Sequence, residues 1–310
     1  MQWEPSASLE TIRKRADIYQ QIRAFFSSRD VLEVDTPLLS ASTNTDAQIA
    51  SIKAFNQNQE LYLQTSPEFA MKRLLAAGSA SIYQICHAFR EAETGRRHNA
   101  EFTLLEWYRI GYDYHALMDE IETLIDTLSE RSNKYTRISY HDLVKQYIDI
   151  DIENIQLSDL RNRASELVPG TITRDLDFDQ CLDLLISLTI APRLKGYVFV
   201  YDYPVSQASL ARVKMANPAV AERFELFHDD LELANGFSEL TDANIQRSRF
   251  EEDNQLRVNK DLPCYPVDEK LLAALQSGMP ECAGVALGLD RLLMVLLGLD
   301  SIDQVLCFVD

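Results

Sequence analysis

The sequence is poor in basic residues and in cysteine. Its 310 residues include 30 Lys and Arg against 48 Asp and Glu, giving a formal net charge of −18. Proteins that bind long nucleic acids usually neutralise phosphates with basic residues, so neither tRNA nor DNA is the expected partner. The five cysteines lack the paired spacing of a zinc site or a disulfide framework, which predicts reduced thiols in a cytoplasmic protein.

Long apolar stretches are also missing. The longest, residues 292–299, is too short to cross a bilayer, so no membrane partner is expected. The first fifteen residues have no apolar stretch followed by a small-residue cleavage site, and no export signal is expected. No repeat or long linker interrupts the chain. We therefore expect one domain over residues 1–310, with a mainly helical insertion at about 136–196.

Hydrophobic periodicity predicts the main elements. Ser66 should cap a helix that has Pro67 at its first position and ends at Gly78. Several strands follow one another without an intervening helix, which predicts an α+β fold with an antiparallel sheet flanked by helices. The expected helices are 9–29, 66–77, 114–128, 160–168, 178–189, 242–259 and one after residue 288; the expected strands are a short one before Pro37, then 82–89, one near 102–107, 197–203, 223–228, 231–237 and one that ends at Ala286.

Residues 89–108, FREAETGRRHNAEFTLLEWY, place arginine, histidine and asparagine in a turn between two strand-like segments. This pattern predicts an antiparallel hairpin in which Arg90 ends the first strand. A guanidinium there can offer a planar fork to a phosphate or carboxylate. Glu106 and Tyr108 are two residues apart on the second strand and should share a face. One site could thus hold both an anion and a cation; the alternative is an exposed hairpin with ordinary surface charges.

The segment FELFHDDLELANGFSELTDA carries Glu225, Glu232 and Glu239 at intervals of seven. Two paired strands with a turn near Asp229 and Asp230 would bring Glu225 and Glu232 across from each other. Hard oxygen ligands favour magnesium, which relies on one or two carboxylates plus substrate phosphates. A solvated acidic hairpin is the alternative.

A third cluster, Gly284, Gly288, Asp290 and Arg291, lies at a strand-to-helix junction. Glycine allows the backbone to approach a ligand closely, and Arg291 comes at the start of the helix. The alternative is that Asp290 and Arg291 serve only local electrostatics at the helix terminus.

Taken in this order, these segments resemble the class II aminoacyl-tRNA synthetases. The first helix with VLEVDTP resembles motif one, FREAETG with RRHNAEFTLLEWY motif two, and GVALGLDR motif three. Within the class, TSPEFAMKRLL, HNAEFTLLEWY and LELANGFSELTDA resemble lysyl-tRNA synthetases. The likeness runs from about residue 10 to the end, and too few residues precede the first helix for an anticodon-binding barrel. Such a core resembles the bacterial elongation factor P lysine ligases, which attach (R)-β-lysine to a lysine of that translation factor.

The resemblance implies ATP and Mg²⁺, a two-step reaction through an acyl-adenylate, and elongation factor P as the protein substrate. Arg90 and Arg291 would be catalytic and would also bind ATP. The other residues that it implies for the nucleotide are Glu91, Ala92, His98, Asn99, Phe102, Glu232, Leu233 and Gly288, with Glu225 and Glu232 holding the metal. Those that it implies for the amino acid are Ser66, Pro67, Glu68, Glu106, Tyr108, Asn235, Glu239 and Ala286. Motif one implies a homodimer.

Three residues depart from the family pattern. Ala92 stands where these synthetases usually carry glutamate near adenine, which leaves backbone to make that contact, and Ala100 replaces the usual proline after His98 and Asn99. Ala286 replaces a glycine that is usual in lysyl-tRNA synthetases. Its methyl group would crowd an α-amino group but not a β-amino group. Two other readings stay open: a free-standing lysyl-tRNA synthetase-like or small-amide ligase, and an inactive paralogue with a regulatory binding role.

Overall fold

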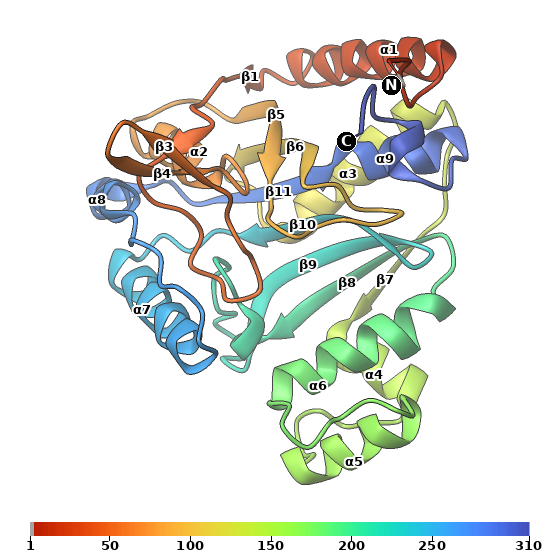
Figure 1. Ribbon diagram of the computed structural model, residues 1–310, viewed down its shortest axis with the longest axis vertical. Coiled ribbons are helices and arrows are strands. Elements are labelled where there is room, and N and C mark those ends of the chain that lie inside the picture. The colour runs from red at the N-terminus through yellow and green to blue at the C-terminus, as the bar shows by residue number, and fades with distance from the viewer. Residues whose placement is uncertain (1–2, 310) are drawn as a thin grey trace. The chain divides into compact units, whose positions relative to one another are not determined.

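The computed structural model describes residues 3–309 and divides into two compact units (Figure 1). The first runs to Arg131 and resumes at Ser238; the second is Ser132–Phe237. The expected single domain with an insertion stays a prediction, and its ends, Met1, Gln2 and Asp310, lie outside the described residues. No helix within residues 3–309 has both the length and the apolar composition needed to cross a bilayer.

The first unit is built on the predicted hairpin. Strands β5 (Ile82–Phe89) and β6 (Glu101–Ile110) are antiparallel, with Ile82 opposite Tyr108 and Phe89 opposite Glu101. Strand β11 (Cys282–Gly288) pairs antiparallel with the other side of β6, and β1 (Leu32–Glu33) pairs parallel with β5. The order is β1-β5-β6-β11. A separate small sheet, which the sequence analysis did not predict, has the order β2 (Leu39–Ser40), β4 (Gln59–Leu63), β3 (Lys53–Asn56).

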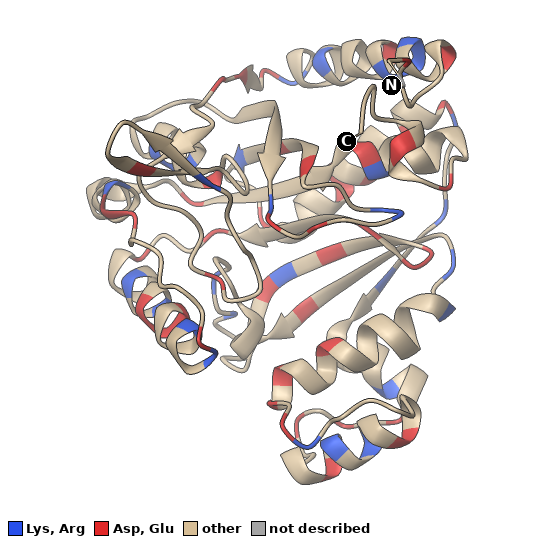
Figure 2. Cartoon of the chain, in the orientation of Figure 1, with Lys and Arg blue, Asp and Glu red and all other residues tan. Residues whose placement is uncertain are grey.

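Helix α1 buries one apolar face against this sheet. Ser8 caps it by accepting the backbone N–H of Thr11, and Phe26 stacks on Tyr83 and meets Trp107 edge-on. The six helices that the structure describes in this unit are α1 (Leu9–Ser27), α2 (Glu68–Ala76), α3 (Tyr114–Ser129), α7 (Ala243–Asn259), α8 (Glu269–Gly278) and α9 (Leu289–Leu297). Among these six helices, α8 alone was not predicted. Acidic and basic residues are interspersed along α7 (Figure 2).

The predicted start of α2 is wrong by one residue. Pro67 is the N-cap rather than the first helical residue, and Ser66 precedes the cap. Ser66 still acts locally, because its Oγ accepts the backbone N–H of Glu68 at 3.1 Å. Gly78 follows the helix with φ +89°, a left-handed conformation that glycine adopts without strain, so the predicted end is confirmed.

The second unit has the strand order β10-β9-β8-β7. Strands β8 (Tyr197–Pro204), β9 (Val220–His228) and β10 (Leu231–Ser238) are antiparallel, and β7 (Tyr135–Ser139) is parallel to β8. The α+β class is therefore confirmed. The sheet is largely antiparallel, with a parallel pair in each unit.

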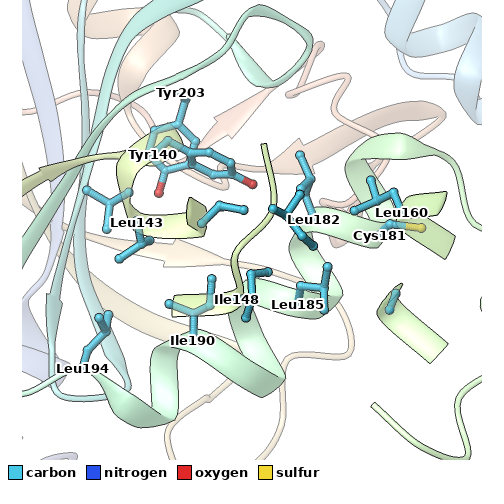
Figure 3. Close-up of a cluster of buried hydrophobic side chains, with 14 of the residues drawn as sticks. Tyr140, Leu143, Ile148, Leu160, Cys181, Leu182, Leu185, Ile190, Leu194 and Tyr203 are labelled. Carbon is cyan, nitrogen blue, oxygen red and sulfur yellow. The ribbon is translucent and has the colours of Figure 1, made fainter. Parts of the chain in front are cut away.

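Three helices of the second unit, α4 (Tyr140–Ile148), α5 (Leu157–Leu167) and α6 (Phe178–Leu185), pack around a buried apolar cluster (Figure 3). Leu143 and Leu182 lie in this cluster, together with Val198 and Val200 from β8. Asp177 caps α6, as its oxygen accepts the backbone N–H of Gln180. The predicted helix over 178–189 is α at first and continues as a π-helical turn, Ile186–Ile190.

The predicted pairing of Glu225 with Glu232 is wrong. The turn at Asp229 is present, but Glu225 lies opposite Asn235 and Glu232 lies opposite Phe227. With the two-residue turn at Asp229 and Asp230, Glu225 would lie opposite Ala234, and the bulge between Glu232 and Ala234 moves its partner by one residue to Asn235. Counting residues from the turn therefore excludes the pairing with Glu232, whereas the bulge itself could not be located from the sequence.

Candidate active site

The centre of β6 carries a buried carboxylate. The side chain of Glu106 shares a face with Tyr108, as predicted, and the Tyr108 hydroxyl donates to Glu106 Oε1 at 2.8 Å. Ser66 Oγ donates to Glu106 Oε2 at 2.6 Å. Burial and the nearby charge of Glu68 raise the pKa of Glu106 to about 8. The hydroxyl groups orient this carboxyl group, and ionising it would leave a negative charge with no bonded cation among residues 3–309.

A buried lysine joins two further carboxylates. Lys72 on α2 lies 2.6 Å from Glu68 Oε1 and 2.6 Å from Glu239 Oε2, and its side chain is 1% exposed. Burial opposes the charge on Lys72, but Glu239 and Glu68 outweigh it and raise the pKa of Lys72. We call Glu68, Lys72, Glu106, Tyr108 and Glu239 the acidic cluster.

The sequence analysis missed Lys72. The available signal was a lysine four residues after Glu68 among apolar positions, next to Met71 and three before Leu75, both of which are buried. A lysine on the apolar face of a helix is rarely buried without a partner. Its partner Glu239 is far away in sequence, so the pattern alone did not assign a role.

Strand β11 lets the acidic cluster form, because it carries small residues next to it. A β-carbon at Gly284 would lie 2.3 Å from Tyr108 Cε1 and 2.4 Å from Glu239 Oε1, so no larger residue fits there. The backbone N–H of Gly284 also bonds to Glu239. Ala286 lies opposite Glu106 in the register, and Gly288 lies opposite Leu104.

The two predicted arginines lie close to His98. Arg90 directly follows β5, with its guanidinium carbon 5.2 Å from the centre of the Phe102 ring and Nη1 3.3 Å from Glu93. Partial burial and the positive charges of Arg291 and Arg90 lower the pKa of His98. Arg90 Nε is buried and has no hydrogen-bond acceptor within residues 3–309. Arg90 and Arg291 bring two positive charges to this region, and Arg90 Nε needs an acceptor. An anion such as a phosphate would meet both conditions.

A buried ion pair holds the start of α9. Asp290 Oδ1 lies 2.6 Å from Nη1 of Arg15 on α1, and Oδ2 accepts the backbone N–H of Thr103 at 2.7 Å. Arg15 also donates to Thr103 Oγ1 at 2.8 Å. These bonds fix the residue before Arg291 against β6, next to Phe102. The sequence analysis singled out Asp290 but not Arg15.

Backbone contacts shape the turn between β5 and β6. The N–H of Glu91 donates to the carbonyl of Ala50 at 2.8 Å, and Ala92 adopts φ +62°. Asn99 Nδ2 donates to the carbonyl of Glu101 at 2.7 Å. The conformation of Ala92 is uncommon for a residue with a β-carbon, which indicates that the surrounding contacts impose it.

The second unit holds the remaining predicted residues around Arg223, which the sequence analysis missed. Arg223 forms an ion pair with Glu225 and donates to Asn235 Oδ1 at 3.3 Å. The negative charge of Glu232 also helps to raise the pKa of Arg223. Leu233 is buried at the bulge. Glu225 and Glu232 offer the hard oxygen donors that magnesium prefers, so the donor set fits this ion, although Arg223 competes for Glu225.

Comparisons with known proteins give one consistent result. Residues 1–310 match the family model of the class II tRNA synthetases (D, K and N). Curated relatives named elongation factor P–(R)-β-lysine ligase include those of Edwardsiella ictaluri (strain 93-146), at 46% identity, and Vibrio cholerae serotype O1, at 45%. The relative of that name from Pectobacterium carotovorum is 44% identical, and each alignment covers 99% of this chain and 97% of the relative.

Proposed function

Because the chain belongs to the class II tRNA synthetases of the D, K and N group, we propose that it is an ATP-dependent ligase that activates (R)-β-lysine and transfers it to a lysine ε-amine of elongation factor P. The names of its relatives support the substrates. The acidic cluster supports a diamino acid independently of those names.

The observation that carries this proposal is the charge imbalance of the acidic cluster. Three carboxylates, Glu68, Glu106 and Glu239, share a buried region with a single cation, Lys72. Full ionisation would leave two negative charges unbalanced, which is costly away from water. A diamino acid brings two ammonium groups that would balance them. A neutral amino acid would leave a carboxylate unmatched, and that mismatch provides specificity.

In the first step, a carboxylate oxygen of β-lysine attacks the α-phosphorus of ATP, and the bond to the pyrophosphate oxygen breaks. Arg90 and Arg291 would orient the two anions and stabilise the charge that develops on phosphorus. Magnesium, which Glu225 and Glu232 would hold, supplies charge neutralisation on the phosphates. In the second step, the acceptor ε-amine attacks the acyl carbon, AMP leaves, and the amine loses a proton to solvent.

The remaining residues have supporting roles in this proposal. Phe102 would stack on adenine beneath the nucleotide, and the backbone at Ala92 would contact its edge. Glu68 would bind the β-amino group, and Asn235 the carboxylate. Glu106, Tyr108 and Glu239 would bind the distal ammonium. A homodimer, a cytoplasmic location and the absence of tRNA charging belong to the same proposal.

The test is mass spectrometry of elongation factor P after incubation with the protein, ATP, Mg²⁺ and either β-lysine or α-lysine. We expect one β-lysyl group to be added with β-lysine, and little or no modification with α-lysine. Transfer to tRNA instead would favour a synthetase-like enzyme. A lack of ATP–pyrophosphate exchange with any amino acid would favour an inactive paralogue and contradict the proposal.

A further inference from the structure

Lys72 is the one member of the acidic cluster with no role in the proposed reaction. It is almost completely buried, and it lies 2.6 Å from a carboxylate on its own helix, Glu68, and 2.6 Å from one that follows β10, Glu239. A buried lysine loses its hydration, so it is retained only where its partners repay that cost. Both partners are residues that we assign to the amino groups of the substrate.

We propose that Lys72 is a positioning residue that sets amino-acid specificity, by orienting Glu68 and Glu239 and favouring the charged form of Glu239, so that the pair can receive a doubly charged amine. This inference rests on the proposed function, because it concerns the carboxylates that would receive β-lysine. Lys72 itself would touch neither the reacting carboxyl group nor ATP.

Without Lys72, the carboxylates of Glu68 and Glu239 would lose the counter-ion that they share. Burial raises the pKa of Glu239 to about 7; Lys72 opposes this rise, and the charge of Glu68 adds to it. Glu106 already holds a proton at neutral pH, so without Lys72 a second carboxyl group, that of Glu239, would take one up as well. A protonated carboxyl group is neutral and uses one oxygen as a donor, so it loses the charge attraction that would bind an ammonium.

The geometry also favours an orienting role. One Lys72 Nζ contacts both Glu68 and Glu239, while the N–H of Gly284 holds Glu239 from β11. Two of the three carboxylates therefore share one internal counter-ion, and Glu106 is held by hydroxyl groups instead. Lys72 balances only one of the two charges of Glu68 and Glu239, and no cation bonds to Glu106 among residues 3–309. The cluster could therefore balance both ammonium groups of β-lysine.

The test compares three variants with the wild-type protein. Lys72→Gln removes the charge but keeps donors for both carboxylates, and Lys72→Arg keeps the charge. Arg73→Gln, which removes an exposed cation one position along the same helix, is the matched control. The measurements are β-lysine binding by calorimetry between pH 6 and 9, the KM and kcat of β-lysine-dependent ATP–pyrophosphate exchange, and thermal unfolding of each variant.

We expect Lys72→Gln to weaken binding at neutral pH by roughly 10- to 100-fold and to shift its pH dependence about one unit or more towards alkaline pH. Its kcat should change much less than its KM, since Arg90 and Arg291 are untouched. Lys72→Arg should keep the wild-type pH profile, and Arg73→Gln should match the wild type. A merely structural lysine would change stability without moving the pH profile.

The inference is overturned if Lys72→Gln binds with an unshifted pH profile, or if Lys72→Arg shifts it equally. A second measurement needs no variant. If Lys72 favours the charged form of Glu239, the wild-type protein should release about one proton when it binds β-lysine near pH 7.5, mainly from Glu106. Release of two or more would overturn the inference. A wild-type protein that binds no diamino acid would instead overturn the proposed function, and this inference with it.

Discussion

Asp290 and Arg15 form a buried ion pair, with 2.6 Å between Oδ1 and Nη1, although 275 positions separate them in the chain. The pair joins α1 to the start of α9, and the second oxygen of Asp290 holds the backbone of Thr103. The helix that carries Arg291 is thereby fixed to the strand that carries Phe102. The position of Arg291, which we assign to catalysis, thus depends on Asp290, to which we assign no contact with substrate.

Asp290→Ala should destabilise the fold, because it leaves the Arg15 charge buried and unpaired. The free energy of unfolding, measured with urea, should fall by about 3 kcal/mol or more. The control is Lys14→Met, which breaks the exposed pair with Glu10 on the same helix and should cost about 1 kcal/mol or less. If both variants lost the same free energy of unfolding, the buried pair would contribute no more to stability than the exposed one.

Arg90→Lys should slow adenylate formation by roughly 10²- to 10³-fold in kcat, since a lysine keeps the charge but loses the planar fork. Amino-acid-dependent ATP–pyrophosphate exchange measures this. Arg96 lies in the same turn with its side chain 64% exposed, and Arg96→Lys should leave the rate unchanged. Comparable losses in both variants would argue for a general effect of the turn.

Ala286→Gly should improve activity with α-lysine relative to β-lysine by roughly tenfold, because Ala286 stands where lysyl-tRNA synthetases usually have glycine and its methyl group would crowd an α-amine. The readout is the ratio of kcat/KM for the two amino acids in the exchange assay. Ala283→Gly, at a buried position whose side chain leaves the other face of the same strand, is the control and should keep the ratio. No relative gain with α-lysine would refute this account of the β-amino preference.

Binding of β-lysine should strengthen as the pH rises from 6 to about 8. Burial raises the pKa of Glu106 to about 8, so below that pH its carboxyl group is neutral in the unliganded protein and cannot pair with an ammonium. Glu106→Gln should weaken binding and flatten this pH dependence, as calorimetry can measure. The exposed neighbour on the same strand offers the control Glu101→Gln, which should leave the profile intact.

The raised pKa of Glu106 also predicts that its contribution to the stability of the unliganded protein falls as the pH rises. The folded state binds the Glu106 proton more tightly than the unfolded state does, so this group's contribution is greatest below its ordinary value of 4.5 and is lost as the pH rises to about 8. Urea unfolding of the wild type and Glu106→Gln at pH 6 and 8 measures the difference. A wild-type protein that gained stability from Glu106 over this interval would contradict the raised pKa.

Local patterns in the sequence determined most of the elements. Alternation and turn residues predicted the β5–β6 hairpin, the position of Arg90 at the end of a strand, and the shared face of Glu106 and Tyr108. These features depend on residues that are close together in the chain. There, the repeat of side-chain directions along a helix or strand, together with cap and turn residues, determines the local structure.

Only the tertiary structure decided which distant residues meet. The ion pairs Lys72–Glu239 and Arg15–Asp290 join segments far apart in the chain, and no local pattern specifies them. The bulge that places Glu225 opposite Asn235 rather than Ala234 likewise depends on how the two strands pair. Sequence chemistry indicated which residues could carry charge, whereas packing determined which of those charges are buried together and therefore what they can bind.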